Sequence, residues 1–179
     1  MPDFVRRMPE GDTRERLICP DCGHIAYENP KVVVGSVVVS DECVLMCRRA
    51  IEPRRGFWTL PAGYLELGET LEEGEMREAW EEACARIEPE GVLGLFSISR
   101  LGQVQVIFRA RFAGTPAFAA GTESLAVALF PWQRIPWPEI AFPSVGWALR
   151  AWRAAGSAPL GAPTRNPAED RPARGETLD

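Results

Sequence analysis

A cluster of eight glutamates within residues 63–85 constrains this chain more than any other feature of its sequence. Arg77 is the only basic residue in that stretch. Like charges four residues apart on a helix repel one another, so an exposed helix usually mixes both signs. Residues 70–83 are mostly strong helix formers, and Gly74 is the only helix breaker among them. The stretch therefore predicts an acidic helix whose charge is best explained if a cation binds to it.

Three glutamates near the end of this helix have the spacing of metal ligands. Glu78 and Glu82 are one helical turn apart, so their carboxylates lie on the same face. Glu81 lies about 100° around the axis from Glu82, and Arg77 can fix it as an i,i+4 neighbour. The backbone of Ala62, next to a glycine, can also approach an ion closely. Oxygen ligands suit Mg²⁺ or Mn²⁺, whereas a merely solvated acidic helix would not explain this spacing.

The same stretch resembles the Nudix box, the signature of the Nudix hydrolase family. That box is a glycine, five residues, a glutamate, seven residues and then Arg-Glu-aliphatic-x-Glu-Glu-x-Gly-aliphatic. It is matched here by Gly63, Glu69, Arg77-Glu78-Ala79, Glu81-Glu82 and Ala85. Cys84 stands where the family has a glycine, in a left-handed turn that a Cβ disfavours by roughly 1 kcal/mol or more. This departure affects the geometry of the helix exit, not the ligand set.

The order of predicted elements indicates the fold class. Strands before and after the acidic helix, with a second helix over residues 139–155, indicate an α/β/α sandwich around a mixed sheet. The Nudix resemblance implies the same fold. We expect a partial zinc-ribbon-like segment over residues 1–30 and a Nudix hydrolase domain over residues 31–155. Residues 156–179 contain almost no large apolar side chain and are expected to form a disordered tail.

A Cys-x-x-Cys pair near the N-terminus has the pattern of a zinc knuckle. Structural zinc usually takes four ligands from two such knuckles, so Cys19 and Cys22, even with His24, are half of a site. Two free or buried cysteines in a turn explain the residues as well as bound Zn²⁺ does. The segment resembles the N-terminal zinc ribbon of one Nudix subgroup, which includes plant FAD/ADP-ribose pyrophosphatases. Either the first knuckle is lost here, or translation starts upstream of Met1.

Several residues outside the acidic helix are candidates for contact with a substrate. Arg48 and Arg49 end a predicted strand and can face negative charge, although plain surface arginines explain them equally well. Phe57 and Trp58 precede the helix and can hold a base or ring, but core packing is the commoner fate of such side chains. Glu123, at the mouth of the last predicted strand, is the candidate general base or supplementary metal ligand, although an ordinary loop carboxylate explains it nearly as well.

Composition excludes other classes of function. A net charge of −5 argues against a general nucleic-acid or anionic-membrane surface, and no apolar run approaches a membrane span. Five cysteines without a disulfide framework indicate a reducing, cytoplasmic setting. A single histidine leaves little for a Ser-His-Asp triad, so the chemistry falls to carboxylates and a metal ion. The sequence does not fix the oligomeric state, and a homodimer stays open.

The sequence thus predicts an enzyme that hydrolyses the pyrophosphate bond of a nucleoside diphosphate linked to another moiety, releasing AMP. In that reading, Glu78 and Glu82 hold divalent ions with help from Glu81, while Arg77 and Glu69 keep the ligands in place. Resemblance to the plant-like subgroup points to FAD or ADP-ribose as the small-molecule nucleotide substrate. NADH remains a candidate substrate because NADH pyrophosphatases also carry zinc ribbons. The alternative is a Nudix domain that binds a nucleotide without hydrolysing it, as a sensor or adaptor.

Overall fold

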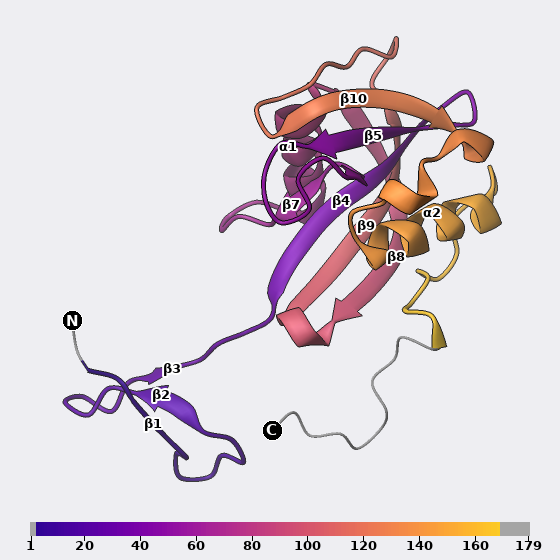
Figure 1. Ribbon diagram of the computed structural model, residues 1–179. Coiled ribbons are helices and arrows are strands. Elements are labelled where there is room, and N and C mark those ends of the chain that lie inside the picture. Colours follow the sequence, from indigo (N-terminus) through magenta and orange to yellow (C-terminus); the bar gives the residue numbers. More distant parts are fainter. Residues whose placement is uncertain (1–2, 169–179) are drawn as a thin grey trace. The chain divides into compact units, whose positions relative to one another are not determined.

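The computed structural model describes residues 3–168, which belong to two compact units divided between Pro30 and Lys31. The first unit is a small antiparallel sheet in the order β1-β2-β3 (Figure 1). Its strands are β1 (Val5–Arg7), β2 (Arg16–Ile18) and β3 (Ile25–Ala26). Cys19 and Cys22 lie in the turn between β2 and β3, where the Gly23 N–H donates to the Cys19 carbonyl at 2.9 Å.

The second unit is built on one mixed sheet in the order β10-β5-β4-β9-β8, with β6 paired to β5 and β7 paired to β4. β4 and β9 run parallel, and the other pairs are antiparallel. The strands are β4 (Lys31–Ser40), β5 (Cys43–Arg49), β6 (Trp58–Thr59), β7 (Ala62–Tyr64), β8 (Ile87–Ile98), β9 (Gln103–Phe112) and β10 (Ser124–Pro131). This pairing places the short strand β7 beside the middle strand of the sheet.

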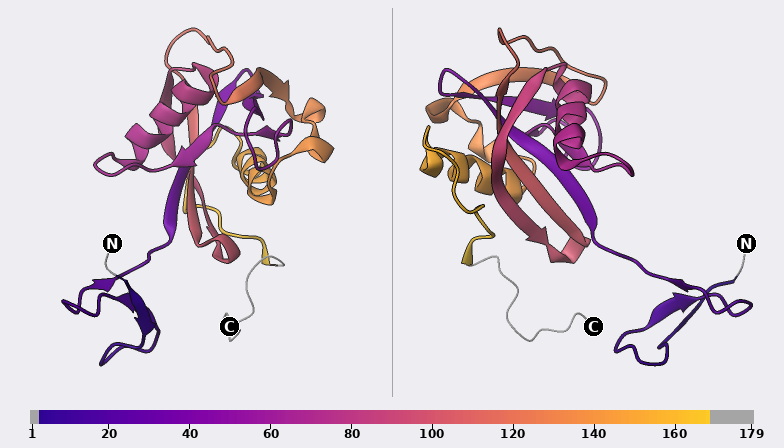
Figure 2. Two further views of the ribbon diagram at one scale, coloured as in Figure 1. Left: turned by 60° about the vertical axis from the view of Figure 1, so that its left-hand side comes forward. Right: turned by 180° about the vertical axis from the view of Figure 1, so that it is seen from behind.

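Two helices cover opposite faces of this sheet, α1 (Leu71–Ala83) on one and α2 (Pro143–Ala155) on the other (Figure 2). Successive residues of β4 point to opposite faces. Val38 therefore packs with Ala79 of α1, whereas Val37 packs with Leu149 of α2. The predicted α/β/α sandwich around a mixed sheet is confirmed. Three single-turn helices complete the unit: η1 (Ser99–Leu101), η2 (Trp132–Arg134) and η3 (Trp137–Glu139).

The second helix begins later than predicted. α2 starts at Pro143 rather than at residue 139, because Phe142 is extended, with φ −138° and ψ 144°. Proline suits the first helical position, where its missing N–H would have no partner within the helix. Within residues 3–168, neither α1 nor α2 has the length and apolar character needed to cross a membrane.

Residues 156–168 do not form the expected disordered tail but run along β8. Thr164 exchanges backbone hydrogen bonds with this strand at 2.8 and 2.9 Å. The Asn166 side chain accepts from the Ser97 N–H at 2.8 Å and donates to the Ser97 carbonyl at 3.0 Å. A side-chain amide therefore anchors the segment as a neighbouring strand would, which a count of large apolar residues cannot detect. Residues 169–179 of that prediction lie outside the described residues.

Candidate metal and substrate site

Local sequence fixes both ends of α1, the helix that carries the acidic cluster. The Thr70 hydroxyl accepts the Glu73 N–H at 3.2 Å, and the Glu73 carboxylate accepts the Thr70 N–H at 2.7 Å. This reciprocal capping box stabilises the start of the helix. Cys84 ends the helix in the left-handed conformation, with φ 48°, and its N–H bonds to the Trp80 carbonyl at 2.8 Å. Cysteine thus adopts the turn expected of glycine, and the helix exit is preserved.

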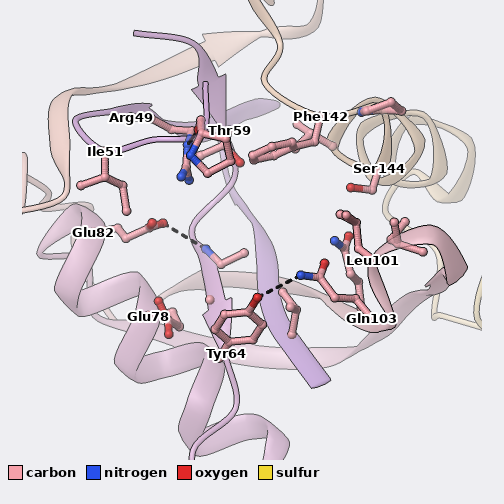
Figure 3. Close-up of a pocket in the computed structure, with 18 of the residues that line it drawn as sticks. Arg49, Ile51, Thr59, Tyr64, Glu78, Glu82, Leu101, Gln103, Phe142 and Ser144 are labelled. Atoms are coloured by element: carbon pink, nitrogen blue, oxygen red, sulfur yellow. Dashed lines mark hydrogen bonds between the residues drawn. The ribbon is translucent and has the colours of Figure 1, made fainter. Parts of the chain in front are cut away.

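A cavity of about 1020 Å³ lies between α1, the sheet and the first turn of α2 (Figure 3). Helix α1 lines it with Glu78, Glu81 and Glu82 together with Arg77. Strands and helices on the other side contribute polar, basic and apolar side chains, among them Ser97, Arg100, Gln103, Gln105, Ser144, Ile98 and Trp147. Glu52, Glu66, Glu123, Arg49 and Asn166 complete the charged and polar lining.

Two buried carboxylates lie at the acidic end of this cavity. Glu78 is 8% exposed and Glu82 is 5% exposed. The Ala62 N–H donates to Glu82 Oε2 at 3.0 Å. The Glu78 carboxylate lies against Gly63, where a Cβ would overlap both of its oxygens. Strand β7 therefore positions both groups, one through a backbone donor and the other through a missing side chain.

Burial raises the pKa of both carboxyls. Loss of water raises the pKa of Glu82 to about 8; Glu78 and Glu123 add to the rise, while a backbone hydrogen bond and Arg49 oppose it. Loss of water also raises the pKa of Glu78, against the opposing effect of Arg77. Neither the Glu78 nor the Glu82 carboxylate has its negative charge fully compensated by neighbouring residues. A cation that binds here would therefore displace a proton from these carboxyls.

Arg77 ties the acidic residues together. Its guanidinium donates to both oxygens of Glu69 at 2.7 and 3.0 Å, to Glu78 at 2.7 Å and to Glu81 at 3.1 Å. It also donates to the Tyr64 carbonyl at 2.9 Å. The hydrogen bond from Arg77 is the main cause that lowers the pKa of Glu69 to about 2. A planar group with five donors can make these contacts at once, and the single ammonium of a lysine cannot.

The structure brings most of the other predicted site residues to the cavity. Glu81, whose side chain is exposed, and Glu123, just before β10, both line it. Arg49 lines it too, held by a hydrogen bond from its Nε to a loop carbonyl at 2.8 Å. Ala62, whose backbone was predicted to approach an ion, uses its N–H to bind Glu82. The roles of these residues in metal binding and catalysis stay predictions.

Arg48 was predicted to face the substrate, and the structure places it elsewhere. It neighbours Arg49 on β5, and successive strand residues point to opposite faces, so Arg48 does not line the cavity. Its Nε instead donates to the Gly56 carbonyl at 2.7 Å. The two arginines therefore have different surroundings despite their adjacent positions.

The structure also places the two aromatic residues predicted to contact a substrate, Phe57 and Trp58, outside this cavity. Trp58 packs edge-to-face on Phe130, with ring centroids 4.9 Å apart, and joins the core beneath α2. Phe57 lies under the Arg54 guanidinium, 5.2 Å from ring centroid to charge, and does not line the cavity. Core packing, the commoner fate of such side chains, explains Trp58.

Sequence reasoning missed the wall opposite α1. Phe142 and Ser144 reach the cavity from the start of α2, and Gln103 reaches it from β9 (Figure 3). Gln103 Nε2 donates to the Tyr64 hydroxyl at 3.1 Å. The Arg49 guanidinium lies 5.2 Å from the centroid of the Phe142 ring. In the sequence, Pro143 indicates that a helix can start there. It does not indicate that the first turn of this helix lines the cavity.

The residues around Glu78 and Glu82 fit a magnesium or manganese ion. Their oxygens are hard donors, and the surrounding carboxylates leave an excess of negative charge. Within residues 3–168, no three acidic, thiol or imidazole side chains converge closely enough to hold a metal ion by themselves. The pair Glu78 and Glu82 suits an ion such as Mg²⁺, which uses one or two carboxylates and completes its shell with water and substrate phosphate.

The described residues of the first unit do not fit a complete zinc site. The backbone N–H groups of Cys22 and Asp21 lower the pKa of Cys19, as they would for a thiolate ligand. Structural zinc takes four ligands, however, and residues 3–30 offer as thiol or imidazole groups only the two cysteines and His24. Whether this pair binds zinc stays a prediction.

The fold and the carboxylate site define the class to which the chain belongs. The family model described as the NUDIX domain matches residues 29–148, and that of the Nudix N-terminal zinc ribbon matches residues 3–28. The chain is therefore a member of the Nudix hydrolase family. The narrower assignment to a plant-like FAD/ADP-ribose subgroup goes beyond these matches.

Individual relatives agree with this family. A crystal structure of a NUDIX hydrolase from Nitrosomonas europaea is 44% identical, with a TM-score of 0.83 over 91% of each chain. An ADP-ribose pyrophosphatase from Methanocaldococcus jannaschii is 35% identical over 40% of this chain, and an 8-oxo-dGDP phosphatase from Homo sapiens is 38% identical over 58% of it. The matches span 42% and 33% of these two curated relatives, less than half the length of either.

Proposed function

We propose that this chain is a divalent-metal-dependent hydrolase of the pyrophosphate bond in a nucleoside diphosphate linked to another moiety. The observation that carries the proposal is the pair of buried carboxyls, Glu78 and Glu82, at the acidic end of a cavity of about 1020 Å³. Burying carboxylates is costly unless a proton or a cation compensates their charge. A divalent ion held by Glu78 and Glu82 would compensate their charge, which explains why both lie at the cavity.

Each residue of the acidic cluster has a separate task in this proposal. When bound, a Mg²⁺ or Mn²⁺ ion would offset negative charge in the transition state and lower the pKa of the attacking water. Glu78 and Glu82 would hold that ion, and Arg77 would keep their side of the cavity in place through Glu69. The Glu123 carboxylate has no hydrogen-bond partner among the described residues and lines the cavity, so it is our candidate to accept the proton of the water.

ADP-ribose is the first substrate that we propose, followed by FAD and NADH, with AMP as the common product. Support for ADP-ribose comes from the printed activity of the Methanocaldococcus jannaschii relative. Support for FAD comes from the resemblance of residues 58–66 to the plant-like subgroup. The cavity, at about 1020 Å³, lies at the upper end of the roughly 300–1,000 Å³ usual for small-molecule sites, which suits a dinucleotide.

A product assay tests the proposal directly. The purified chain, with Mg²⁺ or Mn²⁺, is offered ADP-ribose, FAD, NADH and 8-oxo-dGDP side by side. Glu82→Gln keeps the shape of the side chain but removes its charge, and should lower kcat/KM by about 100-fold or more. Glu72→Gln, an exposed carboxyl of the same helix outside the cavity, is the matched control and should keep the wild-type rate. Equal rates for Glu82→Gln and wild type would contradict the assigned site.

Nucleotide binding without hydrolysis gives a different result in the same experiment. A sensor or adaptor would release no product from any of the four compounds, yet would bind at least one of them in a calorimetric titration. Glu82→Gln would then leave the affinity largely unchanged, whereas in the hydrolase the same variant loses turnover. Product release by wild type and Glu72→Gln, but not by Glu82→Gln, therefore decides for the enzyme.

A further inference from the structure

The cavity wall opposite α1 combines apolar side chains with polar and basic ones. Among the described residues, the lining that comes from β8, η1, β9 and α2 contains no acidic side chain. The 13-residue helix α2 starts at this wall with Pro143, and Phe142 at its N-cap supplies no capping side chain. The first N–H groups of an α-helix lack partners within the helix and carry partial positive charge. At the start of α2, Pro143 has no N–H and the Val145 N–H donates to the Phe142 carbonyl at 3.1 Å. Ser144 therefore carries the remaining N–H of these three residues and gives this end of the helix its positive potential.

Ser144 adds a side-chain donor at the same place. It is only 6% exposed, yet it lines the cavity, and its hydroxyl turns toward the interior (Figure 3). The residue is otherwise enclosed by the fold, so the cavity is the space on which this hydroxyl opens. A hydroxyl placed in this way is available to an acceptor that binds in the cavity.

Arg49 supplies a full positive charge beside that helix end. Its Nε donates to the Pro53 carbonyl at 2.8 Å, and its guanidinium lies over the Phe142 ring, 5.2 Å from the centroid. These contacts hold the side chain through its Nε and the face of its guanidinium, and its charge also acts on Glu82, whose pKa it lowers. An arginine held in this way keeps donors available for an anion.

We propose that Arg49, Ser144 and the first turn of α2 form an anion site that binds a second phosphate group of the nucleotide, next to the metal end of the cavity. This inference rests on the proposed role of the cavity as the nucleotide site. A helix N-terminus, a hydroxyl and an arginine are donors that phosphate oxygens accept well. The phosphate can be the neighbour in the same pyrophosphate, or a monoester elsewhere on the nucleotide.

Binding without a metal ion tests this site separately from hydrolysis. The full chain is titrated calorimetrically in EDTA, at fixed ionic strength, with ADP-ribose and with 2′-phospho-ADP-ribose. The variants are Ser144→Ala, Ser144→Asp and Arg49→Gln. Ser144→Asp is the sharpest of them, because an acidic residue in the first turn favours the helix but repels a phosphate. Arg48→Gln is the matched control, since Arg48 also donates to a loop carbonyl but lies outside the cavity.

We expect Ser144→Asp and Arg49→Gln to weaken binding by about 10-fold or more, Ser144→Ala by a smaller factor, and Arg48→Gln to leave it unchanged. If the site holds the second phosphate of the pyrophosphate, the variants bind ADP-ribose and 2′-phospho-ADP-ribose more weakly than wild type by the same factor. If it holds a monoester, the 2′-phosphate raises wild-type affinity about 10-fold, and the variants lose only that gain. Melting curves confirm that each variant is folded.

Two results would overturn the anion site. One is unchanged affinity of Ser144→Asp and Arg49→Gln for both probes, and the other is a wild-type chain that binds neither. In both cases the hydrolase proposal is decided independently, because AMP release with Mg²⁺ is measured in a different assay and with a different variant. Failure of one proposal is therefore distinguishable from failure of the other.

Discussion

Glu75 is a buried carboxyl on α1 that the proposed chemistry does not use, and its burial leads to a quantitative prediction. Its side chain is fully buried, and neither carboxylate oxygen has a hydrogen-bond partner among the described residues. Loss of water raises its pKa to about 9, and the charge of Glu72 adds to the rise. At neutral pH the folded protein therefore keeps Glu75 protonated, whereas the unfolded chain ionises it.

The difference between the two states sets the size and sign of the effect. Below pH 4.5, the ordinary pKa, both states are protonated and Glu75 adds no pH dependence. As the pH rises from 4.5 toward 9, the unfolded chain loses its proton first, so stability falls by about 1.4 kcal/mol per pH unit. At pH 7 the loss is roughly 3 kcal/mol. Above about pH 9 both states are ionised and the loss is constant.

Glu75→Gln tests this reasoning because it keeps the shape of the side chain and cannot ionise. We expect the free energy of unfolding of the variant to increase relative to that of wild type as the pH rises, by up to about 1.4 kcal/mol per pH unit. The difference between the two proteins should be smallest near pH 4.5. The buried amide has unpaired donors of its own, so the slope is more diagnostic than the offset. Urea unfolding in EDTA at pH 5, 6, 7 and 8 measures it. Glu72→Gln, on the exposed side of the same helix, should show no comparable slope.

A stability difference between Glu75→Gln and wild type that stays constant from pH 5 to 8 refutes the reasoning. It would mean that Glu75 has the same protonation state in the folded and unfolded chains throughout that range. A difference that falls as the pH rises would also refute it, since that sign belongs to a carboxylate stabilised in the folded state.

Three further changes test the metal end of the cavity. Gly63→Ala should lower kcat by about 100-fold with little change in melting temperature, because the new Cβ displaces the flexible Glu78 carboxylate; an unchanged kcat would show that its position is unimportant. Mg²⁺ affinity, measured by calorimetry from pH 6 to 9, should rise about tenfold per unit up to pH 8 and then level, because the ion displaces the proton of Glu82. Glu82→Gln should remove most of that slope, and retention of the slope would assign it to another group. Arg77→Lys should lower kcat/KM by about 10-fold or more and raise the pKa of Glu69 above its value of about 2 in an NMR titration. A Glu69 pKa that does not move would contradict the assigned hydrogen bonds.

The acidic end of the site could be predicted because its geometry is local. Glu78 and Glu82 share a face through helical periodicity alone, and Arg77 reaches Glu81 across one turn. Glu69 lies before the helix, and its contact with Arg77 depends on how the chain enters the first turn. The motif spacing encodes that loop length, so the pair could be expected without knowledge of the rest of the fold.

The opposite wall could not be predicted, because its residues meet only through the sheet. Arg49 and Phe142 are 5.2 Å apart in space but far apart in sequence. Arg48 carries the same charge one position before Arg49. The two side chains have different surroundings only because successive residues of β5 point to opposite faces of the sheet. Asn166 escaped notice for a different reason. Its segment is anchored by hydrogen bonds to Ser97, and hydropathy does not register such bonds.

The short strand β7 explains why the family motif begins at a glycine well before the helix. Three consecutive residues each contact a different charged residue of α1: the Ala62 N–H binds Glu82, Gly63 makes room for Glu78, and the Tyr64 carbonyl accepts from Arg77. Two of these contacts use only the backbone, which any residue supplies except where the donor N–H is missing in proline. The third depends on the absence of a side chain. Of the three positions, only Gly63 therefore requires one particular residue, and that position is the one that the motif specifies.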